Sequence, residues 1–206
     1  TGGRYHASLL STAEAVEAMR RAKERGLPVT CDTAPHYFTL NENAVGDYRS
    51  FAKVLPPLRG ESDRAAIAEA VVDGTIDAIC SDHAPQDQDA KRLPFAAAAW
   101  GMAGLETLLP LSLALVHQGR MSLLELLKRL TLNPAAILQG RAALEPGLPA
   151  DLVIFDPDRA WVIDPDRFLS KSKNSAFDNH PVQGKVLRTI VDGRSIFTLS
   201  ETAAAD

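Results

Sequence analysis

A carboxylate and an imidazole stand side by side at Asp82 and His83, directly after a short apolar run from Ile76 to Cys80. Such side chains can move protons or bind metal ions. The run is too short for a helix, and Gly74 before it and Pro85 after it favour a buried strand. In parallel α/β folds the chemistry gathers where strands end, so the pair is a candidate site. The alternative is that Asp82 caps a turn and His83 lies on the surface.

The composition is that of an ordinary globular protein. The 206 residues are 46% hydrophobic and 23% charged, with a net charge of −4, enough for one domain of moderate size or a domain with an appendage. The mild acidity gives no reason to expect nucleic acid or an anionic membrane as partner. The most apolar stretch, Phe95 to Val116, is interrupted by Glu106 and Pro110, which favours a core helix over a membrane span.

The cysteines indicate the cellular compartment, and the first residues indicate whether an N-terminal part is missing. Cys31 and Cys80 both fall inside predicted strands, where they are expected to be reduced core residues. With no recognisable leader, the expectation is a cytoplasmic protein. The chain opens with Thr1 directly before a strand, which indicates that an N-terminal part is missing.

Strands and helices are predicted to alternate along the first half, the rhythm of a parallel sheet. Strands are expected near 4–9, 28–34 and 76–81. Ser11 and Glu14 form a predicted capping box for the helix after the first strand. Further predicted elements are a short strand at 51–55 and helices at about 62–73, 103–117, 122–130 and 134–139.

From Asp151 the character of the sequence changes. The segments 151–155, 160–163 and 185–191 are rich in β-formers, and Asp192-Gly193 is a hairpin signal. We therefore expect three parts. They are an α/β region at 1–145, a small β appendage at 146–199 and a disordered tail at 200–206.

Several motifs in this order resemble the C-terminal half of a dihydroorotase, an amidohydrolase of the type related to the multifunctional pyrimidine-synthesis enzymes. The resemblance covers about residues 3–197. The motifs are Arg4-Tyr5-His6, Ser11-Thr12-Ala13-Glu14, Val29-Thr30, Leu55-Pro-Pro-Leu-Arg59, Asp63-Arg64, Asp73-Gly-Thr-Ile-Asp77, Ser81-Asp-His-Ala-Pro85, Gly104-Leu-Glu-Thr107, Asn133-Pro134, Pro149-Ala-Asp-Leu-Val153 and Ser170-Lys-Ser-Lys-Asn174.

The resemblance implies the second half of a (β/α)8 TIM-type barrel, strands five to eight, followed by part of a small β domain. It also implies one or two zinc ions at the barrel mouth and interconversion of N-carbamoyl-aspartate and dihydroorotate. Asp82 would be both a metal ligand and the catalytic general base, with His83 as a supporting neighbour. Trp100 and Gly101 would lie near the substrate.

Four positions depart from the family's pattern. The resemblance places metal-binding histidines at Leu9 and Tyr37, and substrate contacts through Asn and His at Leu55 and Gln86. Hydrocarbon cannot coordinate a metal, and a phenol must first lose a proton from a pKa near 10. We therefore expect at most one zinc ion, bound by Asp82 and by ligands outside this chain.

Neighbouring histidines are possible substitutes for the missing ligands. His6 lies three residues before Leu9, and the alternation of a strand predicts that it points toward the surrounding helices if Leu9 faces the barrel interior. His36 lies beyond the end of its predicted strand, where alternation is less binding, and is the better candidate. A histidine that is merely packed or hydrogen-bonded in a loop is the alternative.

Two hypotheses about function follow. The first is a dihydroorotase-like protein that has lost catalysis and serves as a structural partner of aspartate transcarbamoylase, with a homodimer expected for the protein alone. The second is an active one-metal dihydroorotase or related cyclic amidohydrolase. The four changes favour the first hypothesis. A fragment of an unrelated barrel is a third alternative, which the order of the motifs disfavours.

Overall fold

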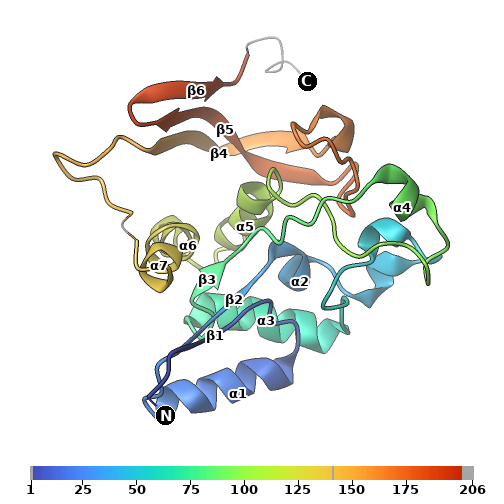
Figure 1. Ribbon diagram of the computed structural model, residues 1–206, viewed down its shortest axis with the longest axis horizontal. Coiled ribbons are helices and arrows are strands. Elements are labelled where there is room, and N and C mark those ends of the chain that lie inside the picture. The colour runs from blue at the N-terminus through green and yellow to red at the C-terminus, as the bar shows by residue number, and fades with distance from the viewer. Residues whose placement is uncertain (1, 141, 201–206) are drawn as a thin grey trace.

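Two three-stranded sheets organise the computed structural model, which describes residues 2–140 and 142–200 (Figure 1). One sheet is parallel and the other is antiparallel. The parallel sheet has the order β1 (Tyr5–Ala7), β2 (Val29–Thr33), β3 (Ala78–Ile79), and the antiparallel sheet has the order β4 (Leu152–Val162), β5 (Pro181–Val191), β6 (Arg194–Thr198).

The helices fall mainly between and after the parallel strands. The helical elements are α1 (Ala13–Glu24), α2 (Pro35–Thr39), α3 (Glu61–Asp73), α4 (Gln88–Arg92), α5 (Leu108–His117), α6 (Leu123–Leu130) and α7 (Leu132–Ile137), with 3-10 turns η1 (Glu42–Val45), η2 (Ser50–Ala52) and η3 (Pro165–Arg167). In the described part of the chain, no helix combines the length and apolar character that a bilayer crossing requires.

The parallel sheet contains three strands, not the four expected. Asp32 of β2 pairs with Ala78 of β3, so no strand lies between them. The predicted strand at 51–55 is wrong, because this segment holds the 3-10 turn η2 and then runs into Pro56-Pro57. Proline has no N–H to give to a sheet ladder, which explains why pairing fails there.

Side chains of the parallel sheet divide between a helix-covered face and an open face. Ala7 and Cys31 are buried in one apolar cluster with Val16 and Met19 of α1. His6 pairs with Thr30 one residue earlier on each strand, so both project from the opposite face. The helices therefore cover only one side of β1 and β2.

Helix ends follow capping chemistry, with small departures from the prediction. Helix α1 is capped by Thr12, whose hydroxyl accepts from Ala15 N at 3.2 Å, and not by Ser11. Helix α3 is preceded by Gly60 and ends at Gly74, which has φ 90° and stops it as predicted. Glycine is needed there because a side chain is strained in the left-handed region.

The antiparallel sheet contains the predicted hairpin. Strands β5 and β6 pair on either side of Asp192-Gly193, where φ is 48° and 74°, as a tight hairpin turn requires. The segments 151–155 and 160–163 belong to one strand, β4, whose pairing shifts register between Asp156 and Ala160. The described residues stop at Ser200, so most of the predicted tail, 201–206, lies outside them.

Helix α5 joins the two sheets. It lies between β5 and the parallel sheet in Figure 1 and packs directly against β5. Gly184 of β5 has φ 103°, and a Cβ there would lie 2.2 Å from Cδ1 of Leu113. Glycine therefore allows α5 to approach the sheet, and Trp161 Nε1 closes the contact by donating to Gly184 O at 2.9 Å.

Candidate functional site

Asp82 lies just past the end of β3, as the sequence predicted. Its backbone adopts φ 42°, a left-handed conformation that aspartate tolerates better than most residues. Its side chain is 16% exposed. The strand end is held from the other side by Gly104, where a Cβ would lie 2.2 Å from Ser81 O. The glycine of the Gly104-Leu-Glu-Thr motif thus allows a loop to pack against the base of the candidate site.

His83 supports this arrangement through its ring and its backbone. Nδ1 of His83 accepts a hydrogen bond from Gly104 N at 3.1 Å. His83 also pairs with Met102 in an isolated parallel bridge, and Ala84 N donates to Met102 O at 2.9 Å. The side chain is therefore committed to holding the 101–104 loop in place.

His36 is the side chain that faces Asp82. Its Nε2 lies 3.3 Å from Oδ2 of Asp82, and the residue is only 3% exposed. The distance fits an ion pair, but the angles do not fit a hydrogen bond, and Nε2 has no hydrogen-bond partner among the described residues. We therefore describe the contact as an ion pair without a hydrogen bond, because the strength of a hydrogen bond depends steeply on its angle. Nε2 is thus a buried polar atom aimed at a carboxylate without a bond to it.

Tyr37 points elsewhere. Its hydroxyl donates to Pro56 O at 2.8 Å, and the residue is 3% exposed. Burial, with the nearby charge of Asp82, raises the pKa of the phenol above its ordinary value, which keeps it protonated. A protonated phenol that is already hydrogen-bonded is a poor metal ligand. Residue 36, not residue 37, therefore occupies the position next to Asp82.

Leu9 ends β1 in an unusual backbone conformation. Its φ is 59°, and its N–H donates to Oδ1 of Asp32 at 2.7 Å. The hydrocarbon side chain packs against the core. Position 9 thus offers no ligand atom, as its side-chain chemistry requires.

His6 does not point toward the helices, so that prediction is wrong. Its Nδ1 lies 2.8 Å from Oγ1 of Thr30, and its Nε2 lies 3.1 Å from Oδ2 of Asp32, both on the open face. The prediction counted alternation from Leu9, but the left-handed turn at Leu9 breaks the alternation. Ser8 also donates to Asp32, at 3.1 Å, which completes a polar network that the sequence did not reveal.

The loop from Pro85 to Gly104 carries the residues expected near the substrate. Trp100 is 48% exposed, and Gly101 has φ 111°. A Cβ on Gly101 would lie 2.5 Å from Cβ of Ala84, so only glycine fits here. Leu55, at the position where the family carries asparagine, is also exposed.

Two lysines that the sequence analysis missed hold this loop. Lys91 is fully buried and donates to Ala99 O at 2.9 Å and Gly101 O at 3.0 Å. Burial, with the charge of Lys53 nearby, lowers the pKa of Lys91 to about 8. Nζ of Lys53 donates to carbonyl oxygens of Phe95, Ala96 and Ala98. A lysine in a loop normally indicates a solvated side chain, so the sequence carried no signal of this role.

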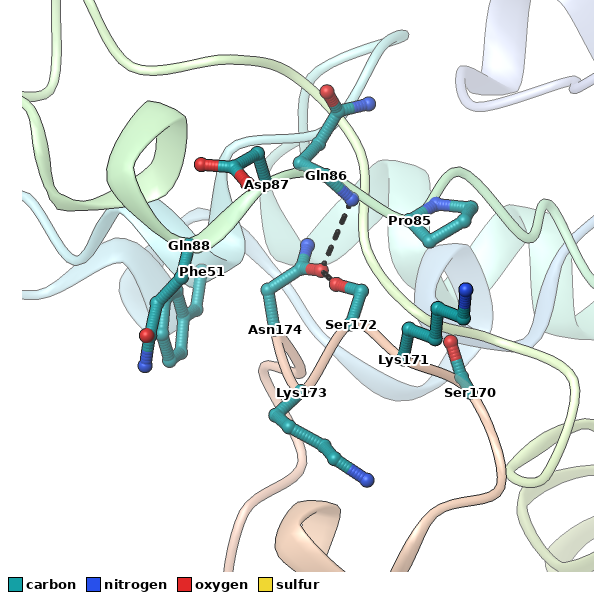
Figure 2. Close-up of a pocket in the computed structure, with 10 residues that line it drawn as sticks. All are labelled: Phe51, Pro85, Gln86, Asp87, Gln88, Ser170, Lys171, Ser172, Lys173 and Asn174. Carbon is teal, nitrogen blue, oxygen red and sulfur yellow. Dashed lines mark hydrogen bonds between the residues drawn. The ribbon is translucent and has the colours of Figure 1, made fainter.

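Gln86 lines a cavity of about 510 Å³ that includes neither Asp82 nor His36. Figure 2 shows Asn174 between Gln86 and Ser172; the amide of Asn174 accepts from Gln86 N at 3.3 Å and donates to Gly101 O at 2.9 Å. Asn174 thus ties the Ser170-Lys-Ser-Lys-Asn segment to the site loop. The lining residues are Phe51, Pro85, Gln86, Asp87, Gln88, Ser170, Lys171, Ser172, Lys173 and Asn174.

Comparison with known proteins places this arrangement in a family. The model of the amidohydrolase family matches residues 3–196, nearly the whole chain. The chain belongs to the amidohydrolase family. Within this amidohydrolase, the three parallel strands are consecutive strands of a TIM-type barrel, and β4–β6 form part of a small β domain.

Individual relatives show which members of the family this chain resembles. The curated dihydroorotase of Anaplasma phagocytophilum (strain HZ) is 49% identical over 197 residues, which cover 95% of this chain and 44% of that protein. The L-hydantoinase (dihydropyrimidinase) from Arthrobacter aurescens has a TM-score of 0.88 at 30% identity over 97% of this chain and 47% of that chain. An inactive dihydroorotase-like domain of a CAD-like multifunctional protein from Chaetomium thermophilum has a TM-score of 0.69 at 22% identity over 93% of this chain and 50% of that one, a likeness of fold alone. The chain spans about half the length of these relatives.

The side chains at the mouth fit part of a metal centre. Imidazole nitrogen and carboxylate oxygen are both zinc ligands, and His36 Nε2 is a buried atom without a hydrogen-bond partner among the described residues. Those residues contain no cluster of three or more His, Cys, Asp or Glu side chains that could hold a metal ion. Because zinc sites normally have at least three protein ligands, this pair can supply only two of them.

Proposed function

We propose that this chain is the C-terminal half of a dihydroorotase-type cyclic amidohydrolase that interconverts N-carbamoyl-aspartate and dihydroorotate. One observation carries the proposal: Asp82 stands at the end of a parallel strand, partly exposed, where this fold places its chemistry. Curated dihydroorotases such as that of Anaplasma phagocytophilum support the choice of substrate.

In this proposal Asp82 moves the proton. Ring opening adds water across one ring C–N bond: the water oxygen bonds to the carbonyl carbon, and the ring nitrogen leaves with a proton. Asp82 accepts the proton from water and delivers it to the departing nitrogen, and ring closure runs the same steps in reverse. The exposed Trp100 and the glycine at 101 border the space in which substrate would lie.

A zinc ion, when bound, would polarise the carbonyl and ease deprotonation of water. We propose at most one such ion, with Asp82 as a ligand and further ligands outside this chain. Neither Leu9 nor Tyr37 binds this ion. Leu9 has no donor atom, and the hydroxyl of Tyr37 donates to Pro56 O.

Loss of catalysis is the second candidate function, and the side chain of Leu9 favours it. In that case the protein would act as a structural partner of aspartate transcarbamoylase in the cytoplasm and form a homodimer when alone. The sequence by itself favours this alternative, because four positions, Leu9, Tyr37, Leu55 and Gln86, depart from the family's pattern. Two considerations now support catalysis instead. Tyr37 does not face Asp82 while His36 does, and close curated relatives are named dihydroorotases.

Turnover of the native full-length protein tests the proposal. We expect zinc-dependent conversion of both N-carbamoyl-aspartate and dihydroorotate, at a rate on the order of 10 per second, typical of enzymes. No turnover with either substrate, in a folded and metal-loaded protein, would contradict it. Co-purification with aspartate transcarbamoylase, measured by size-exclusion chromatography with light scattering, would then support the structural role, and separate elution would remove that role as well.

A further inference from the structure

Lys53 anchors the loop that carries Trp100 and Gly101. Its ammonium group has three N–H bonds, and three backbone carbonyls of the loop accept from it. They are Phe95 O at 2.7 Å, Ala96 O at 3.0 Å and Ala98 O at 2.7 Å. The backbone of Lys53 adds a fourth bond, because Gly101 N donates to Lys53 O at 2.9 Å. Hydrogen bonds from a charged donor are the stronger kind, so the ammonium group has a fixed place beside the loop.

The same ammonium group lies beside the ring of Trp100. Nζ of Lys53 is 5.4 Å from the ring centroid of Trp100 and 5.4 Å from that of Phe95. Both distances lie within the range of a cation–π attraction. Trp100 is 48% exposed, so packing in the core does not by itself fix its ring. The cation that the carbonyls hold in place is therefore a point against which an exposed indole is oriented.

We propose that Lys53 is a positioning residue, which holds the Trp100 ring in the orientation that contacts the cyclic substrate and so raises the affinity for it. This inference rests on the proposed function, in which Trp100 borders the space for substrate. A side chain that is ordered before binding loses less conformational freedom when the ligand arrives. Preorganisation of this kind is measured as tighter binding.

A role in holding the loop backbone alone does not account for the ring contact. The fully buried Lys91 already fixes the end of the loop, because it donates to Ala99 O and Gly101 O. The contact between Lys53 and the ring of Trp100 adds little to folding, since cation–π pairs at exposed sites are weak. Its expected effect is on the molecule that the exposed ring meets.

Substrate binding by the full-length protein and its variants tests the inference. Lys53→Met removes the charge, Trp100→Ala removes the ring, and a third variant combines the two changes. Lys185→Met is the matched control, because Nζ of Lys185 lies 3.4 Å from the ring centroid of Trp161 in the antiparallel sheet. Steady-state turnover gives KM and kcat for dihydroorotate. Equilibrium dialysis against labelled dihydroorotate measures affinity whether or not the protein turns it over.

The expected result is a change in KM that depends on the Trp100 ring. Lys53→Met should raise KM by about fivefold or more and leave kcat within about twofold of the native value, since a loss of binding shared by ground and transition states raises KM alone. Partial unfolding would instead lower the apparent kcat and leave KM unchanged. The double variant should match Trp100→Ala, because residues that act through one another are not additive. Lys185→Met should match the native protein.

The possible outcomes separate this inference from the proposed function. Unchanged affinity in folded Lys53→Met overturns the inference, even in a protein that turns over dihydroorotate. A double variant whose KM shows the product of the two single effects also overturns it, since Lys53 would then act without Trp100. Weaker binding in Lys53→Met, by a protein that never turns over dihydroorotate, supports the positioning role and contradicts the proposed function. No binding by the native protein overturns both.

A second variant covers the case in which Lys53→Met fails to fold, as circular dichroism would show. Lys53→Arg then replaces it, because arginine keeps the charge but its flat guanidinium cannot direct three donors to the same carbonyls. Weaker binding of dihydroorotate by that variant supports the positioning role, and unchanged binding overturns it.

Discussion

Two histidine–carboxylate pairs are associated with the same parallel sheet, and they differ in how their polar atoms are used. On the open face, His6 lies within hydrogen-bond distance of Thr30 and Asp32 through its two ring nitrogens. At the mouth, His36 and Asp82 face each other without a hydrogen bond, although His36 is almost fully buried. A satisfied network stabilises the fold, whereas the pair at the mouth leaves the buried Nε2 of His36 without a hydrogen bond, which is unfavourable for folding.

The comparison predicts that substitutions at the two pairs affect different measurements. Substitutions in the His36–Asp82 pair should reduce turnover and leave the free energy of unfolding nearly unchanged. Changes on the open face should do the reverse. A substitution that moved both quantities equally would show that the two pairs are not functionally distinct.

Asp82→Asn should have the largest effect. Asparagine keeps the shape and tolerates φ 42°, but it cannot accept a proton from water. Turnover of dihydroorotate should fall by about 10²–10⁴-fold, the usual contribution of a general base. Chemical denaturation should give a free energy of unfolding within about 0.5 kcal/mol of the native protein. Residual turnover above one tenth of the native rate would remove Asp82 from the mechanism.

Asp32→Ala should have the largest effect on stability. Asp32 accepts hydrogen bonds from Leu9 N at 2.7 Å and Ser8 Oγ at 3.1 Å and lies within bonding distance of His6. Its removal should cost about 1–3 kcal/mol, because the partly buried Leu9 N–H and His6 ring lose their acceptor. Urea denaturation measures the change, with the exposed Asp178→Ala as the control. A cost no larger than that of the control would mean that the open-face network contributes nothing to the fold.

The sequence predicted much of the scaffold because its signals are local. Gly74 ends a helix and Asp192-Gly193 makes a hairpin through conformations that their own residue types favour. Asp82 at a strand end also followed from a short apolar run and its flanking residues. These features need no knowledge of distant contacts.

The site pair could not be predicted in the same way, because it joins residues 46 positions apart in the chain. Which of residues 36 and 37 faces Asp82 depends on where β2 gives way to α2, and a shift of one residue exchanges them. The wrong prediction for His6 has a similar cause. One left-handed residue, Leu9, interrupts the alternation of side chains from which the orientation of His6 was predicted. Element boundaries are the least certain part of a sequence-based prediction.

Lys91→Met should destabilise the loop that borders the mouth, with a pH dependence of defined sign. The variant removes a donor to Ala99 O and Gly101 O, which should cost about 1–2 kcal/mol at neutral pH. Burial lowers the pKa of Lys91 from 10.5 to about 8, so between these values the unfolded chain binds the extra proton. The native protein should therefore gain stability relative to the variant as pH rises from about 8 to 10.5.

Thermal unfolding of both proteins across that pH range measures the difference, and subtraction removes the other groups that titrate there. A difference that shrinks as pH rises would mean that the Lys91 pKa is raised by its carbonyl partners. In that case the ammonium would stabilise the loop by its charge, and the loop would loosen in alkaline solution instead.

Tyr37→Phe should have the smallest effect and bears most directly on the assignment of positions 36 and 37. The variant removes only the hydroxyl that donates to Pro56 O at 2.8 Å. The loss should be about 0.5–1.5 kcal/mol of stability, the net worth of one hydrogen bond. Tyr48→Phe, at a residue that is 75% exposed, is the matched control and should be neutral. Zinc content should not change in either variant, because the ring of Tyr37 is oriented away from Asp82. Loss of zinc in Tyr37→Phe, with the fold intact, would place the phenol oxygen in the metal site and contradict the orientation of Tyr37 toward Pro56 O.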